Sequence, residues 1–224
     1  MTRPRIFAAV LLLLGLPSGM ALAQEKFELA KVYLERNVVD KDAEVKFEAI
    51  GGKGGMKTLK VVAPDGRTVI DFSTPASKMG MRHLSLESPE PKDDGTVQAE
   101  FPAGAYVFTA VATDGARLEA KAMLSHKFPD ATAFVRPQPD AKNVPVKGVQ
   151  VSWKLLKGMD SHIVVIEDEA SGRNLKVSLS GGTSAFAVPD GFLQPGVDYK
   201  LAVGTVAKDG NSSFIETGFT TAKK

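Results

Sequence analysis

The sequence predicts an all-β protein built from two tandem β-sandwiches, and three observations support this fold class. Short runs of alternating apolar and polar residues recur from Lys26 to the end of the chain, which is the period of half-buried strands. Turn residues such as Pro64-Asp65-Gly66 and Thr113-Asp114-Gly115 separate these runs, with glycine where the turn needs a positive φ. The length left after the N-terminal leader, about 200 residues, fits two sandwiches of about 100 residues each.

The leader, residues 1–23, has the pattern of a secretory signal peptide. Arg3 and Arg5 precede an apolar run over residues 6–16, and Ala21-Leu22-Ala23 is a small-residue cleavage site. The apolar run is shorter than the ~20 residues that span a bilayer. We therefore expect cleavage before Gln24 and a soluble chain that is periplasmic or secreted. No cysteine follows the cleavage site, so no lipid anchor is expected there.

Charge and cysteine content exclude several function classes. The chain has 28 basic and 26 acidic residues, and the leader holds two of the basic ones, which leaves 26 of each after cleavage. A neutral chain without a clustered basic face is not expected to bind nucleic acid or anionic membranes. The absence of cysteine excludes disulfides, thiolate metal sites and a cysteine nucleophile.

The first sandwich is expected to span residues 24–128. Its first segment, Phe27–Asn37, is compatible with a short helix or a strand, and strand is favoured. The glycine-rich segment Gly51–Gly55 and the polar segment Ser88–Gly95 are expected to be loops between strands. Further strands are expected over residues 45–50, 58–63, 68–72, 82–87, 97–101, 106–112 and 117–126.

A proline-rich stretch marks the boundary between the sandwiches. It contains Phe128-Pro129-Asp130, the run from Arg136 to Asp140, and Pro145. Because proline donates no backbone hydrogen bond, it is typical of strand starts and edges. We place the boundary near residue 129, so the second sandwich is expected over residues 129–224. The linker is short, which limits the angles between the two parts.

The second part contains three landmarks in order: the Trp153 strand, a corner at Pro195-Gly196 and Tyr199, and Phe219-Thr220-Thr221. On these landmarks it resembles a fibronectin type III domain over residues 131–221. The resemblance implies a second immunoglobulin-like sandwich and a role in adhesion, spacing or protein binding. The integrin-binding Arg-Gly-Asp turn is replaced by Lys208-Asp209-Gly210-Asn211, and Asn211-Ser212-Ser213 fits a glycosylation sequon in a hairpin where such residues are common.

The first part is similar to the N-terminal sandwich of a group of bacterial exported proteins without an established activity. This similarity rests on Gly104–Phe108, Asp114-Gly115, Leu118 and Ala122–Pro129. It implies a fold and no mechanism.

Two tyrosines occupy equivalent places in the two parts. Tyr106 and Tyr199 each follow a Pro and a Gly and open a strand. A tyrosine at this corner of an immunoglobulin-like sandwich bonds back to nearby backbone. We predict that role for both.

Two metal hypotheses arise, although no metal site is predicted outright. Met79, Met81 and His83 share one face at strand spacing, and thioethers with imidazole suit Cu(I). The alternative is that the methionines fill core space and His83 starts a strand.

Oxygen ligands for Ca²⁺ could come from Glu35, Asn37, Asp40 and Asp42. The alternative is ordinary turn chemistry, because Asn and Asp are common in turns between strands.

No catalytic residue is predicted. His83, His126 and His162 do not cluster, and neither a G-x-S-x-G elbow nor a phosphate-binding loop is present. His162 alternates with Val164 and Ile166, which favours a core or half-buried position with one bonded nitrogen, and His126 could face the cleft between the sandwiches.

The sequence thus favours an exported binding or structural module that is not an enzyme and needs no cofactor. Its partner is expected to be a protein of the cell envelope or the extracellular space, with the ligand and the oligomeric state left open. One alternative is a pilus-type periplasmic chaperone that would offer the strand 117–126 to a client. The other is a periplasmic protein that binds copper or calcium.

Overall fold

Sixteen strands and one short helix make up the part of the chain that the structure describes, residues 24–52 and 54–223 of a computed structural model. The strands form an all-β protein of two immunoglobulin-like sandwiches, as predicted. The signal peptide predicted for residues 1–23 lies outside the described residues. No helix among the described residues is long and apolar enough to cross a bilayer.

The first sandwich packs a five-stranded sheet on part of a larger one. The five-stranded sheet has the order β1 (Gln24–Glu25), β8 (Arg117–Leu124), β7 (Gly104–Ala112), β4 (Met56–Val62) and β5 (Thr68–Ser73). The opposing layer consists of β2 (Leu29–Asn37), β3 (Asp42–Ile50) and β6 (His83–Glu87).

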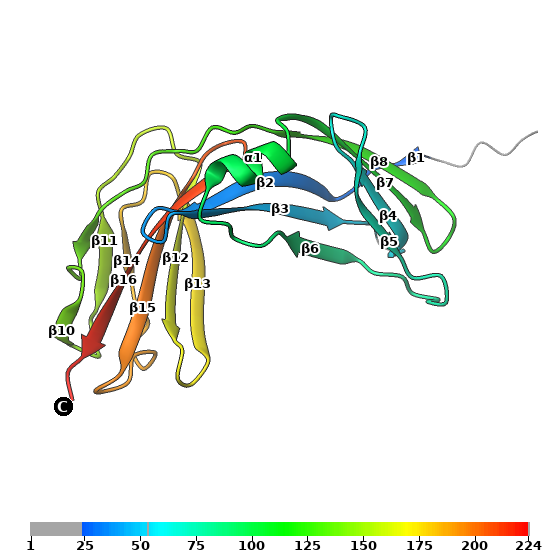
Figure 1. Ribbon diagram of the computed structural model, residues 1–224. Helices are drawn as coiled ribbons and strands as arrows, with labels where there is room; N and C mark the ends of the chain where they lie inside the picture. The colour runs from blue at the N-terminus through cyan, green and yellow to red at the C-terminus, as the bar shows by residue number, and fades with distance from the viewer. Residues whose placement is uncertain (1–23, 53, 224) are drawn as a thin grey trace, which may run out of the picture.

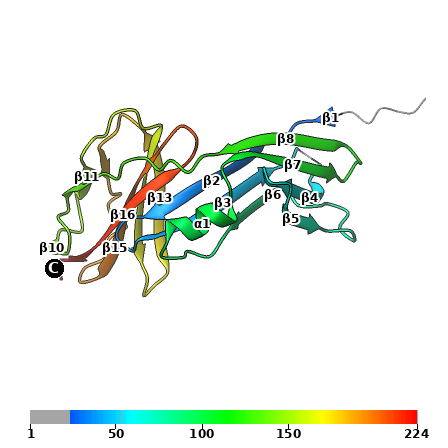
Figure 2. The same ribbon diagram turned by 45° about the horizontal axis from the view of Figure 1, so that its top comes forward.

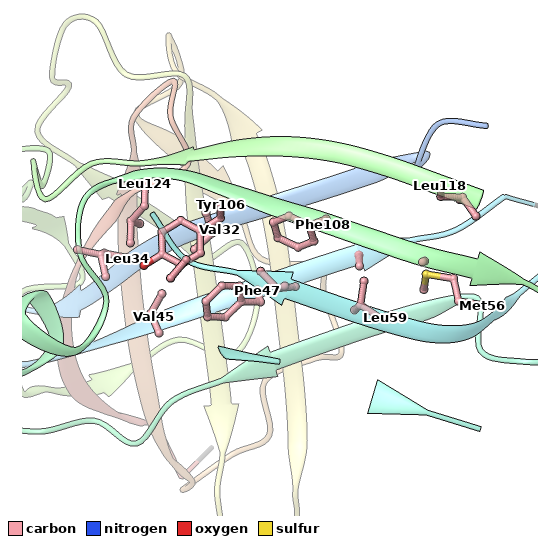
Figure 3. Packing of buried hydrophobic residues seen from close by; sticks show 14 of the residues in the cluster. Val32, Leu34, Val45, Phe47, Met56, Leu59, Tyr106, Phe108, Leu118 and Leu124 are labelled. Atoms are coloured by element: carbon pink, nitrogen blue, oxygen red, sulfur yellow. The ribbon is translucent and has the colours of Figure 1, made fainter. Parts of the chain in front are cut away.

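Alternate residues of these strands point inward and form the first hydrophobic core. Phe47 packs edge-on against Tyr106, with ring centroids 5.8 Å apart, and lies beside Phe108. Figure 3 shows these rings in the middle of the core, with Met56 and Leu118 toward one end. The period-2 pattern of the sequence therefore determines which side chains are buried here.

One predicted strand of the first sandwich is wrong. Residues 97–101 overlap the helix α1 (Asp94–Glu100), which packs beside β3. The carboxylate of Asp93 accepts hydrogen bonds from the backbone N–H of Gly95 and the hydroxyl of Thr96. This is an N-cap, which favours a helix over the extended conformation that the apolar residues suggested.

The second sandwich packs a three-stranded sheet on the other part of the larger sheet. The first contains β14 (Ala185–Ala187), β11 (Gln150–Trp153) and β9 (Phe134–Arg136). The second contains β13 (Arg173–Ser180), β12 (Ser161–Asp168), β15 (Asp198–Val206) and β16 (Ser212–Thr221), with β10 (Ala141–Val144) parallel to β16. Trp153 is buried in the core between them, as predicted.

The two corner tyrosines behave as predicted. Tyr106 donates its hydroxyl proton to the carbonyl oxygen of Pro102, at 3.1 Å. The hydroxyl of Tyr199 accepts from the backbone N–H of Gln194, at 2.9 Å. Both side chains are almost fully buried, and burial raises the pKa of Tyr106 to about 12.

A single eight-stranded sheet runs through both sandwiches. β16 of the second part pairs in parallel with β2 of the first, with Ser212 opposite Glu35 and Phe214 opposite Asn37. The backbone N–H of Val38 extends the pairing by donating to the carbonyl of Phe214, at 2.9 Å. Figure 1 shows the two parts meeting at a bend, and Figure 2 shows β16 beside β2 at that junction. The division of the chain into two domains at residue 129 remains a proposal, because one hydrogen-bonded sheet contains strands from both sides of that residue.

Asn211 is the most extensively bonded side chain at the junction. Its amide oxygen accepts from the backbone N–H of Leu34 at 2.8 Å. Its amide nitrogen donates to the carbonyl oxygens of Ser125 at 2.9 Å and Lys127 at 3.1 Å, and to the hydroxyl of Ser125 at 3.1 Å. The residue is 1% exposed. The turn at Lys208–Asn211 thus fastens the second sandwich to the first, and the sequon Asn211-Ser212-Ser213 is buried.

Arg36 forms a second fastening on the other side of β16. Its Nε donates to the hydroxyl of Ser213 at 2.9 Å, and its guanidinium lies over the ring of Phe128, 4.7 Å from the centroid. Ser213 in turn donates to the carbonyl oxygen of Pro129 at 2.7 Å. The linker is therefore held against the shared sheet.

Candidate functional site

The inside of the bend contains a hollow that both sandwiches line. It has a volume of about 330 Å³ and lies on the solvent-facing side of the shared sheet. The cross-strand pairing explains its lining, because Asp198–Val206 runs beside Ser212–Thr221 and the alternate residues share a face. Its principal lining residues are Glu35, Asn37, Asp40, Asp42, Glu44, Glu90, Glu167, Asn174, Lys176, Lys200, Phe214 and Glu216.

The floor of the hollow is apolar. Phe214 of β16 lies over Gly204 of β15, where a Cβ would come within 2.5 Å of the ring. Val165 and Ala202 continue this surface. Gly204 is thus required for the ring to lie flat on the sheet at the junction.

The walls of the hollow are acidic. Seven carboxylates line it, against three basic side chains. Of the basic residues, Lys200 pairs with Glu216 at 2.9 Å, and Arg36 is engaged by Ser213 and Phe128. The hollow therefore presents an excess of negative charge to solvent, although residues 24–224 as a whole have 26 basic and 26 acidic residues.

One edge of the hollow contains an ammonium group surrounded by carboxylates. Lys46 of β3 lies 3.2 Å from Glu35 of β2, 3.0 Å from Glu44 of β3 and 3.5 Å from Glu87 of β6. Burial by itself lowers the pKa of Lys46, but the carboxylates of Glu35 and Glu44 outweigh it and raise that pKa. Lys46 is therefore charged at any physiological pH, and the surrounding group carries a net negative charge.

Glu44 is the buried member of this group. The residue is only 5% exposed. Burial raises the pKa of its carboxyl to about 7, against the opposing effect of Lys46. Glu44 is the residue at the junction whose charge changes near neutral pH.

All four calcium candidates line the hollow, and the side chains of Glu35, Asn37 and Asp40 already have partners within the protein. The amide oxygen of Asn37 accepts from the backbone N–H groups of Val39 and Asp40, and its amide nitrogen donates to Asp40 at 3.0 Å. Glu35 is paired with Lys46, and Asp42 opens β3. No set of three His, Asp or Glu side chains in the described part of the chain is arranged to hold a metal ion. The contacts favour turn chemistry here, so we build no metal site on these residues.

The side chains of the copper candidates are exposed. Met79 is 83% exposed and Met81 is 47% exposed, so the alternative that they fill core space is wrong. Both precede β6, whose first residue is His83. The shared face expected from strand spacing is not present, because residues 78–80 form no strand and Gly80 has a φ of +65°. His83 is exposed as well.

The other two histidines are structural. His126 is half-buried, and its Nε2 lies 2.8 Å from the carbonyl oxygen of Phe101. His162 is fully buried, with its ring centroid 5.4 Å from that of Trp153. Among the described residues no partner meets hydrogen-bond geometry with either ring nitrogen of His162, although backbone groups of Gly181 and Gly204 oppose part of the effect of burial on its pKa.

We expect His162→Phe to change how stability depends on pH. Burial lowers the pKa of His162 in the folded state, whereas the unfolded side chain titrates near 6.5. The unfolded state therefore takes up the proton first, and the wild type loses stability as the pH falls below about 6.5. Relative to wild type, the variant should therefore gain stability as the pH falls from 7.5 to 5.5.

Urea unfolding of wild type and variant at the two pH values measures this effect. His83→Gln is the control, because His83 is exposed. Equal pH dependence in wild type and His162→Phe would contradict the assignment.

β8, which lies within the strand 117–126 proposed for client binding, has one edge that is only partly paired. β8 pairs along its length with β7, whereas β1 covers only Arg117 and Leu118. No strand within residues 24–52 and 54–223 pairs with the other side of its remaining residues. The chaperone alternative stays a prediction.

Comparisons with known proteins return sandwich modules. The fibronectin type III-like modules of CbhA from Clostridium thermocellum match at 11% identity, over 88% of this chain and 93% of that one, with a TM-score of 0.36. A two-domain fibronectin type III segment of chicken tenascin matches at 16% identity, over 88% of this chain and 98% of that one, with a TM-score of 0.32. Neither a protein-family model nor a curated protein sequence matches the chain.

Proposed function

We infer that the protein is an exported, non-catalytic binding module that presents the hollow at the junction to a protein partner. The observation that carries this proposal is the shared sheet, which holds two sandwiches at one angle and lines the hollow from both sides. A rigid surface loses little conformational entropy on binding. This favours a binding role over a flexible spacer.

The chemistry of the hollow selects the kind of partner. Its carboxylate walls and its floor of Phe214, Val165 and Ala202 match a lysine or arginine side chain, which has an apolar stem and a cationic head. We therefore propose a basic segment of an envelope or extracellular protein as the partner. Complementary charge of this kind mainly increases the rate of association and decreases with added salt.

Site-specific photocrosslinking in the native host tests the proposal. A photoreactive amino acid replaces Lys176, an exposed residue of β13 that lines the hollow. A matched probe replaces Lys121, an exposed residue of β8 in the five-stranded sheet. We expect one protein adduct at position 176, with little adduct at position 121.

Charge reversal then checks the chemistry. Glu167→Lys together with Asp42→Lys should weaken the adduct at position 176, and so should added salt. Equal adducts at positions 176 and 121, or an adduct at position 176 that is insensitive to both changes, would contradict a basic partner in the hollow.

A further inference from the structure

We propose that Met79, Met81 and His83 form a surface site for Cu(I), remote from the hollow and independent of the partner proposed above. The site occupies the segment between β5 and β6. The two methionines supply thioether sulfurs, and His83 supplies one imidazole nitrogen. These are soft and borderline ligands of the kind that prefer Cu(I) to hard cations.

Exposure is the first observation that carries the proposal. Met79 is 83% exposed and Met81 is 47% exposed. Methionine is an apolar residue that usually fills core space, so neither side chain contributes the burial that would explain its presence. With the exposed His83, three potential metal ligands are open to solvent within five residues.

The backbone of this segment is fixed at several points, which is the second observation. Met81 exchanges both backbone hydrogen bonds with Met56, at 2.8 and 2.7 Å. The backbone N–H groups of Met79 and Gly80 donate to the hydroxyl of Ser77, at 3.2 and 2.9 Å. The ligand side chains therefore project from an ordered backbone, which lowers the entropy that metal binding would cost.

Gly80 turns the chain between the two methionines. Its φ is +65°, and a Cβ at this position would lie 2.6 Å from the carbonyl oxygen of Met56. Only glycine fits such a conformation in such close contact. Each methionine side chain has three rotatable bonds, so binding of the metal can draw the two sulfurs toward a common position.

Two basic residues, Lys78 and Arg82, lie beside the ligands in the sequence. Arg82, between Met81 and His83, is paired with Glu28 at 3.1 Å. Binding needs only the lone pairs of two sulfurs and one neutral imidazole nitrogen, so no electron is transferred.

Anaerobic competition for Cu(I) with a weak chromophoric chelator, bicinchoninate, tests the site in the mature chain. We expect one Cu(I) per chain in the wild type. Met79→Leu, Met81→Leu and His83→Gln should each weaken the apparent affinity at least tenfold. Met123→Leu is the matched control, because Met123 is 64% exposed on β8 and belongs to no such group.

A second measurement does not depend on variants. With the methionine methyl groups labelled by ¹³C, addition of Ag(I), a redox-inert substitute for Cu(I), should shift the signals of Met79 and Met81 and leave that of Met123 in place. The proposal is overturned if the wild type fails to compete for Cu(I), if Met123→Leu lowers the affinity as much as Met79→Leu, or if all methionine signals shift alike.

Discussion

Asn211→Ala should destabilise the protein by roughly 3–5 kcal/mol, because it leaves buried backbone groups of the first sandwich and the linker without a hydrogen-bond partner. The amide of Asn211 satisfies the backbone N–H of Leu34 and the carbonyl oxygens of Ser125 and Lys127. Each buried polar group left without a partner costs roughly 1–3 kcal/mol. The effect lies at the upper end of what single substitutions produce.

The expected fall in the melting temperature is on the order of 10 °C for a chain of this length. Lys208→Ala is the control, since Lys208 is an exposed residue of the same turn. Asn211→Asp adds a test of mechanism, because it keeps an acceptor for Leu34 but places negative charge against two carbonyl oxygens. It should destabilise more at pH 7 than at pH 4. A change in melting temperature no larger than that of Lys208→Ala would show that the junction does not depend on Asn211.

Local sequence signals were sufficient for most of the fold. Alternation located the strands, and turn glycines located several of the hairpins, because both depend on residues close together in the chain. The two corner tyrosines were also predictable, since Tyr106 and Tyr199 bond to backbone four and five residues away. The helix at Asp94–Glu100 was missed, because its start depends on the hydrogen bond that the Asp93 carboxylate accepts from Gly95 within a segment assigned to a connection.

The candidate site could not be predicted in the same way. It depends on the parallel pairing of β16 with β2, which joins Ser212 to Glu35 across 177 residues. No residue in β16 or β2 indicates from the sequence that the two strands pair. Asn211 read as an ordinary turn residue, and Glu44 read as one carboxylate among many. Only the pairing of β16 with β2 in the structure shows that Asn211 holds the junction together and that Glu44 is buried beside Lys46.

Glu44→Gln should stabilise the protein at high pH and remove part of its pH dependence. The folded carboxyl has a pKa of about 7, whereas the unfolded one titrates near 4.3. The folded state therefore binds the extra proton between these values. Stability from this group is fully present below about pH 4.3 and is lost as the pH rises through 7. The variant should exceed wild type by about 2–3 kcal/mol at pH 8 and match it near pH 4.5.

Urea unfolding at pH 8, 6 and 4.5 measures this change. Glu87→Gln is the matched control, because Glu87 contacts the same Lys46 at 3.5 Å but its side chain is 65% exposed, and exposed pairs contribute little. Lys46, Glu35, Glu87 and Glu90 are the charged residues nearest to Glu44 in the hollow or its edge. If the Glu44→Gln curve parallels that of wild type, Glu44 is ionised throughout.

The slopes assigned to Glu44 and His162 have opposite signs between about pH 4.5 and 6.5. In the wild type they partly cancel, so a flat stability profile in that range would hide both groups. The single variants separate them: His162→Phe should become more stable on acidification, and Glu44→Gln less stable. Because Glu44 lines the hollow and His162 lies in the second core, only Glu44 changes the charge offered to a partner. Protonation of Glu44 below pH 7 should therefore weaken the binding of a basic segment while it stabilises the fold.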